Sequence, residues 1–262
     1  MTFFTKFVHL QVYSEATFDY GIIRLKNYID FALKNKINIL SLTDKYNLFS
    51  SLKFYSSCIG YGIKPIIGCE IIVDSCLHDD RYSKFLLLCK NYVGYKNLLK
   101  LVSKSYSEDF LSSTPIIKTA WLISLSEGLI AIGLGVESDI GISLLNGNIT
   151  EAKVFSNFWK SVFVDSFYLS VSRTNMENED LYIDLILNSY SDINLPLVAV
   201  NGVYYLSESD LLASILKDSV NATFIVDADY TDSFLRDRYF KILIKCLFFL
   251  RKFQRFCLIV LK

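Results

Sequence analysis

Two carboxylates stand beside apolar runs where a site could form. The run Ile37–Leu42 leads directly into Thr43 and Asp44, and a second run, Ile66–Val73, carries Glu70. In α/β proteins, ligands and catalytic groups gather at strand ends. We therefore expect Asp44 and Glu70 to lie at one cleft, where a metal ion would need further histidine, cysteine or carboxylate ligands.

Other catalytic residue patterns are absent from the sequence. Only two histidines occur, His9 in an apolar strand and His78 in the polar segment LHDDRY, so we interpret the first as a core or strand-end residue and the second as a surface residue. There is no phosphate-binding G-x-x-x-x-G-K-[ST] loop and no G-x-S-x-G nucleophile elbow. The segment GLGVES at 133–138 lacks the third glycine of a dinucleotide-binding loop and fits a strand-to-helix turn.

Apolar spacing predicts the elements that position these residues. Short apolar runs alternate with segments of helical spacing, as in an α/β fold. We expect a parallel sheet covered by helices, because the strands look buried on both faces. The predicted strands are 6–12, 37–42, 66–73, 85–89, 129–133, 166–171 and 196–200, and the predicted helices are 21–36, 48–59, 94–106, 117–124, 138–146, 150–163, 179–190 and 208–219.

Composition limits the classes of protein that fit. The chain has 262 residues, 52% of them hydrophobic, which is enough for a sizeable core, and a formal net charge of zero. A nucleic-acid binder usually carries a basic excess, so any contact with DNA is expected to be indirect. No 18-residue apolar window without a charge and no secretory signal occur, which predicts a cytoplasmic protein with no membrane span. The six cysteines show no C-x-x-C spacing, and we expect free thiols.

The end of the chain differs from the rest. We expect one domain over 1–235 and a basic apolar tail over 236–262, because residues 238–262 contain seven basic residues and no acidic one. On a helical wheel Lys245, Lys252, Arg255 and Lys262 share one arc. Three interpretations stay open: the tail docks on protein, it is the scar of a truncated or shifted reading frame, or it lies on a membrane surface.

Six segments together resemble a known family. They are FVHLQVYSEATF, LSLTDKYNLFSSLKFY, GIKPIIGCE, NYVGYKNLLKLVSKSY, EGLIAIG and LPLVAVNGVYYL. In order and spacing they are similar to the N-terminal polymerase and histidinol phosphatase (PHP) domain of the alpha subunit of bacterial DNA polymerase III, over residues 6–220. The resemblance implies a distorted (β/α)7 barrel and, in members that keep the ancestral site, metal-dependent phosphoester hydrolysis.

The resemblance also implies a set of metal ligands, most of which this sequence replaces. Asp44 and Glu70 are kept, and His9 matches the histidine before the H-x-H pair. The replaced ligands are Gln11 and Tyr13 for that pair, Lys45, Lys84 and Gly135, and Gly202 and Tyr204 in the last motif. Two carboxylates do not hold a metal cluster, so no cofactor is expected. We expect Lys84, and secondarily Lys45, to direct an ammonium group toward Asp44 or Glu70 as a counter-ion.

These substitutions favour a catalytically inactive domain. By resemblance, its partners are the remainder of the alpha subunit and the proofreading exonuclease subunit, to which it would offer a structural and docking surface. The family's polymerase activity belongs to regions downstream of this domain. Two alternatives stay open: a metal-dependent PHP phosphoesterase or 3′–5′ exonuclease, and a non-functional fragment of a decaying gene.

Overall fold

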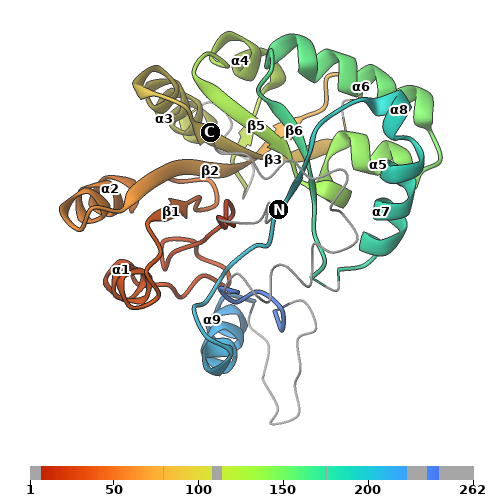
Figure 1. The fold of residues 1–262 in the computed structure, drawn as a ribbon. Coiled ribbons are helices and arrows are strands. Elements are labelled where there is room, and N and C mark those ends of the chain that lie inside the picture. The colour runs from red at the N-terminus through yellow and green to blue at the C-terminus, as the bar shows by residue number, and fades with distance from the viewer. Residues whose placement is uncertain (1–6, 79, 108–113, 175, 223–234, 242–262) are drawn as a thin grey trace, which may run out of the picture. The chain divides into compact units, whose positions relative to one another are not determined.

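The computed structural model describes residues 7–78, 80–107, 114–174, 176–222 and 235–241. These residues group into two compact units. Figure 1 labels their helices and strands. Unit 1 contains the described residues up to Ile67, those of 173–176 and those from Val200 onward. Unit 2 contains those of 68–172 and 177–199.

Unit 1 is built around a short parallel strand pair and three helices. Strand β1 (Ile39–Leu42) pairs in parallel with the first residues of β2 (Lys64–Asp74), the strand that continues into unit 2. The helices are α1 (Leu25–Lys34), α2 (Ser51–Gly60) and α9 (Leu211–Ala222), the last preceded by the 3₁₀ turn η2 (Glu208–Asp210). Their inner faces supply a core that includes Tyr28, Phe54 and Val203.

The prediction of a regular strand at 6–12 is wrong. Its described residues make only single bridges, Val12 with Val203 and, just beyond, Ser14 with Ile23. The reason lies in Thr43, whose Oγ1 accepts the backbone N–H of Val12 at 2.8 Å, while the N–H of Thr43 donates to the Val12 carbonyl at 2.8 Å. A side chain takes the place of a ladder partner, so no regular strand forms.

Unit 2 is a mixed sheet with helices packed on it. The order in this unit is β2, β3, β5, β6, β7, with β4 also pairing with β2. The remaining strands are β3 (Tyr82–Cys89), β4 (Ile116–Ile117), β5 (Leu129–Gly133), β6 (Phe167–Val171) and β7 (Leu197–Ala199). The helical elements are α3 (Tyr92–Ser107), α4 (Thr119–Ser124), η1 (Gly135–Glu137), α5 (Asp139–Leu145), α6 (Ile149–Val162), α7 (Glu179–Asn188) and α8 (Tyr190–Ile193).

The expectation of a parallel sheet is corrected at β3. This strand runs antiparallel to both β2 and β5, whereas β5, β6 and β7 run parallel. Residues 75–81, which join β2 to β3, are too few for a helical crossover, so the two strands form a hairpin. A central strand in a hairpin and one in a parallel sheet are equally apolar when helices cover them. The α/β class itself is confirmed.

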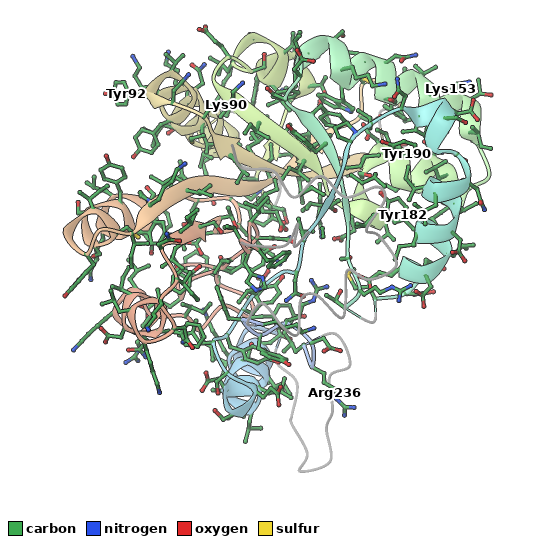
Figure 2. All side chains as sticks on the ribbon, viewed as in Figure 1. Lys90, Tyr92, Lys153, Tyr182, Tyr190 and Arg236 are labelled. Atoms are coloured by element: carbon green, nitrogen blue, oxygen red, sulfur yellow. The ribbon has the colours of Figure 1, made fainter. Side chains whose placement is uncertain are left out.

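Side-chain hydrogen bonds stabilise three of the helices of unit 2. Ser138 Oγ accepts the N–H of Gly141 at the start of α5, and Asn148 caps α6 in the same way through Glu151. Tyr182 of α7, labelled in Figure 2, donates its hydroxyl to the carbonyl of Ser170 in β6 at 3.1 Å. Residues 242–262, most of the predicted tail, lie outside the described residues, so the division at residue 235 stays a prediction.

Candidate functional site

Asp44 follows β1 in unit 1 and is buried there. Its Oδ1 accepts the Ser14 N–H at 2.6 Å and the Thr17 hydroxyl at 2.8 Å, and its Oδ2 accepts the Ser14 hydroxyl at 2.8 Å. Burial raises the pKa of the carboxyl group, while these bonds and the charge of Lys217 act in the opposite direction. Both carboxylate oxygens therefore stabilise the loop at residues 14–17 by hydrogen bonds.

Lys217 is a member of this site that sequence reasoning missed. From α9 its Nζ donates to the carbonyls of Glu15, Thr17 and Gly21 at 3.2, 2.8 and 2.5 Å. Burial lowers the pKa of the ammonium, and the nearby charges of Asp19, Glu15 and Asp44 raise it. Its one signal in the sequence is that it is the only basic residue of segment 207–222.

Four replaced ligand positions come together in unit 1. Gln11 Nε2 donates to the Tyr13 hydroxyl at 2.5 Å, and the Tyr13 ring stacks on Tyr204 with centroids 4.4 Å apart. Position 202 faces the same group, because a Cβ atom there would lie 2.7 Å from Arg238 Nη1 and 3.5 Å from the Tyr13 ring. At and beside positions where the resemblance implies metal ligands, this chain packs an amide, two phenol rings and a guanidinium group.

The Lys45 ammonium group lies against these rings. Its Nζ is 5.6, 5.9 and 5.4 Å from the ring centroids of Tyr13, Tyr20 and Tyr204, within the range of cation–π attraction. It also lies 3.1 Å from Asp19 Oδ2, and the Lys45 side chain is only 12% exposed. A cation belonging to the protein thus lies beside Tyr13 and Tyr204, two positions where the resemblance implies metal ligands.

The three remaining predicted positions lie in unit 2. Glu70 is buried in β2 opposite Leu86. Lys84 of β3 forms an ion pair with Glu137 of η1, at 2.5 Å. Gly135 has a φ of +49°, a left-handed conformation that favours glycine. The ion pairs of Lys45 and Lys84 therefore involve Asp19 and Glu137, which the sequence analysis did not name, and contact of either lysine with Asp44 or Glu70 stays a prediction.

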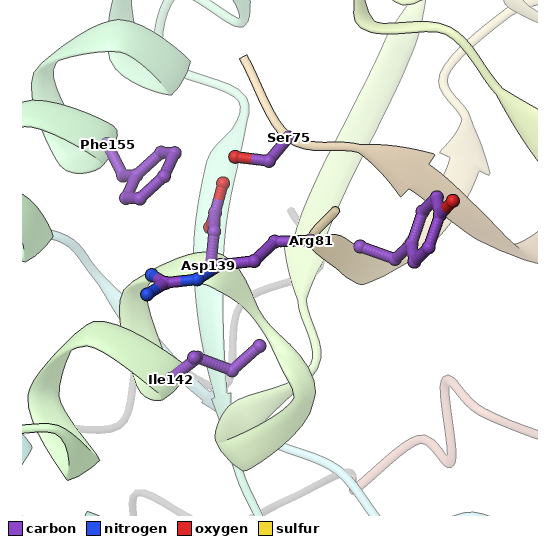
Figure 3. A pocket seen from close by; sticks show the side chains of 6 residues that line it. Ser75, Arg81, Asp139, Ile142 and Phe155 are labelled. Atoms are coloured by element: carbon purple, nitrogen blue, oxygen red, sulfur yellow. The ribbon is translucent and has the colours of Figure 1, made fainter. Parts of the chain in front are cut away.

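Unit 2 also contains a buried carboxylate that the sequence did not single out. Asp139, at the start of α5, accepts the indole N–H of Trp159 at 2.5 Å and the N–H of Ile140 at 2.8 Å. Burial raises the pKa of its carboxyl to about 6, against the effect of these bonds. Asp139 borders a small pocket with Ser75, Arg81, Ile142 and Phe155 (Figure 3). Its volume of about 10 Å³ is enough for one water molecule at most.

Beside this pocket a histidine meets a carboxylate. His78 Nε2 bonds to Glu151 Oε1, which also lies 3.1 Å from Arg81 Nη1. Burial raises the pKa of Glu151, but the His78 bond and the charges of Arg81 and His78 outweigh it and lower the pKa. These contacts tie the β2–β3 connection to α6, and the expectation that His78 is a simple surface residue misses them. His9, by contrast, is a buried histidine as expected, and its Nε2 donates to the Lys241 carbonyl at 2.8 Å.

The residues present do not suit the metal that the resemblance implies. In the part of the chain that the structure describes, no group of three or more histidine, cysteine, aspartate or glutamate side chains could hold a metal ion. Amide, phenol and ammonium groups replace the imidazoles, and an ammonium group repels a cation instead of binding it. We therefore derive no metal chemistry for this chain.

A family model and individual relatives both match the sequence of this chain. The family model described as the PHP domain matches residues 9–174. DNA polymerase III subunit alpha of Pasteurella multocida is 35% identical over 85% of this chain and 19% of its own length, and that of Haemophilus influenzae is 33% identical with the same coverage. The chain thus spans about a fifth of the length of these relatives.

The comparison with solved structures also gives a match. An amidohydrolase from Chromobacterium violaceum is 11% identical, with a TM-score of 0.48 over 75% of this chain and 87% of that chain. At that level of likeness nothing follows about function. Among the described residues, no helix is both long and apolar enough to cross a membrane.

Proposed function

Because the chain belongs to the PHP domain family, we propose that it is a non-catalytic PHP domain of a DNA polymerase III alpha subunit. The similarity to alpha subunits over 85% of the chain supports the assignment to that polymerase. Polymerase activity is not proposed for this chain, which spans only 19% of those relatives. A cytoplasmic location belongs to the same proposal.

One observation carries the non-catalytic assignment. The Lys45 ammonium group lies within 6 Å of the rings of Tyr13 and Tyr204, two positions where the family's histidines stand. A fixed positive charge so close to the former ligands opposes the binding of a second cation. The carboxylate kept beside it, Asp44, already accepts three hydrogen bonds from Ser14 and Thr17.

The proposal includes a role in assembly. The buried Asp44 and the half-buried Lys217 have their polar groups satisfied by backbone and side-chain hydrogen bonds, which supports a stable domain. We assign it a structural role beside the rest of the polymerase and a docking role for the proofreading exonuclease subunit. Contact with DNA would be indirect, since the net charge is zero.

Retention of the exonuclease subunit tests this proposal. The chain is immobilised through an added tag and incubated with the exonuclease subunit of the same organism. We expect retention above that of an unrelated protein on the same resin, and concentration-dependent binding by surface plasmon resonance. No retention by a chain that circular dichroism and thermal melting show to be folded would overturn the docking role.

A further inference from the structure

The outer face of α2 exposes an apolar stripe. Leu52, Tyr55 and Ile59 lie at the i, i+3 and i+7 spacing of one helix face, and Phe49 and Tyr61 flank the helix. These five side chains are 47–72% exposed. The opposite face of α2 carries the core residues Phe54 and Cys58, so the exposed stripe is additional to the core.

Within the segment 45–69, which carries this stripe, the charges have one sign. Between Asp44 and Glu70 the only charged residues are Lys45, Lys53 and Lys64. Lys45 is paired with Asp19, whereas Lys53 and Lys64 are exposed. We infer that this surface, formed by Phe49, Leu52, Tyr55, Ile59 and Tyr61 with Lys53 and Lys64, docks an acidic amphipathic segment of a partner protein.

Other occupants fit the surface less well. Segment 242–262 of this chain has five basic residues and no acidic one, so Lys53 and Lys64 would repel it. A nucleic acid could stack on Tyr55 or Tyr61, but Leu52 and Ile59 offer no flat ring, and two lysines neutralise few phosphates. Apolar anchors at helical spacing beside charges of one sign suit a helical segment with apolar and acidic side chains.

Selection from random peptides displayed on phage tests the inference. Sixteen-residue peptides are selected on the wild-type chain, and we expect the bound population to be rich in both acidic and large apolar residues. The double variant Leu52→Ser/Ile59→Ser should bind the selected peptides at least tenfold more weakly, because both anchors are lost. Lys53→Glu/Lys64→Glu should weaken the binding of acidic peptides at low salt and reverse the salt dependence, because salt then screens a repulsion in place of an attraction.

Leu181→Ser is the matched control, because Leu181 is an exposed leucine on α7 of unit 2. It should leave binding unchanged, and all variants should keep the wild-type melting temperature, since each changed residue is exposed. A selected population that is basic, or one that binds the Leu52→Ser/Ile59→Ser variant as well as wild type, would overturn the inference. So would a concentration-dependent dimer in analytical ultracentrifugation that this variant breaks. Loss of exonuclease retention alone would count against the proposed function and not against this surface.

Discussion

Lys45 lies in surroundings unlike those of a metal ligand. Its ammonium lies among Tyr13, Tyr20 and Tyr204 and pairs with Asp19. Lys45→Met keeps most of the side-chain length but removes the charge, so both attractions are lost. We expect this variant to lower the free energy of unfolding by about 1–2 kcal/mol, measured by urea denaturation.

Lys53→Met provides the comparison for this variant. Lys53 is an exposed lysine of α2, so its replacement should change the free energy of unfolding by no more than about 0.5 kcal/mol. If Lys45→Met has no larger effect than Lys53→Met, the ring contacts of Lys45 contribute nothing to stability.

The raised pKa of Asp139 predicts how the stability of the fold depends on pH. Its pKa is raised to about 6, against 3.8 ordinarily, so between pH 4 and 6 the folded chain keeps a proton that the unfolded chain releases. Stability should therefore fall as pH rises through this window, by about 3 kcal/mol for this group. Asp139→Asn cannot ionise, so the loss should be absent from its urea denaturation curves at pH 4.5 and pH 7.

The wild-type chain must be measured alongside, because His9 acts in the opposite direction. Burial lowers the pKa of His9 to about 4, so its contribution to stability is lost as pH falls from about 6.5 toward 4. The difference between wild type and Asp139→Asn isolates Asp139. A constant difference across the window would contradict the raised pKa.

At the site, the sequence located individual residues better than it located their partners. Asp44 could be placed at a strand end because the apolar run before it is unmistakable. Its partners Ser14 and Thr17 lie 30 and 27 residues away, and Lys217 lies on the last helix described. Such pairings are set by the tertiary fold, which local spacing does not encode. The same holds for Arg238 beside Gly202.

At the scale of elements, two helical glycines should respond oppositely to alanine. A Cβ atom on Gly94 of α3 would lie 1.9 Å from the carbonyl oxygen of Gly128, which is backbone and cannot rotate away. Gly94→Ala should therefore cost about 3 kcal/mol or more. A Cβ atom on Gly60, the last residue of α2, would meet nothing within 4 Å, so Gly60→Ala should stabilise the chain by about 0.5–1 kcal/mol.

Thermal melting of both variants checks this pair. A Gly94→Ala melting temperature close to that of wild type would mean that α3 moves away from Gly128 without cost. A lower melting temperature for Gly60→Ala would contradict the open space around that position.

Helices were predicted from sequence more accurately than strand directions. The spacing behind the predicted helix at 94–106 reflects one buried face, which α3 presents through Leu98 and Leu101. The apolar run of β3 carries no such directional signal, because a covered strand is apolar whether it runs parallel or antiparallel. Its direction follows from the short connection at 75–81, a length criterion that apolar periodicity ignores.

At the scale of the whole molecule, the chain belongs to the PHP domain family, and the resemblance implies that the donors of the family's metal site have changed in type. The match over residues 9–174 identifies the family. If Gln11, Tyr13 and Tyr204 stand at former ligand positions, as the resemblance implies, family membership alone does not predict the chemistry of this chain. Function depends on the side chains at the site, and a fold can persist without them.

Metal binding by the intact chain is the decisive measurement for this view. A metal that binds only the folded chain raises its stability, by about 2.7 kcal/mol at a hundredfold excess over the dissociation constant. We expect zinc and manganese each to leave the melting temperature unchanged, mass spectrometry of the purified protein to find no stoichiometric metal, and a phosphatase assay with either ion to give no activity. The double variant Asp44→Asn/Glu70→Gln is the control, because it removes the two carboxylates kept from the family's ligand set. A metal-induced rise in the wild-type melting temperature that this variant lacks would show that the two carboxylates still bind a cation, and the non-catalytic assignment would then fail.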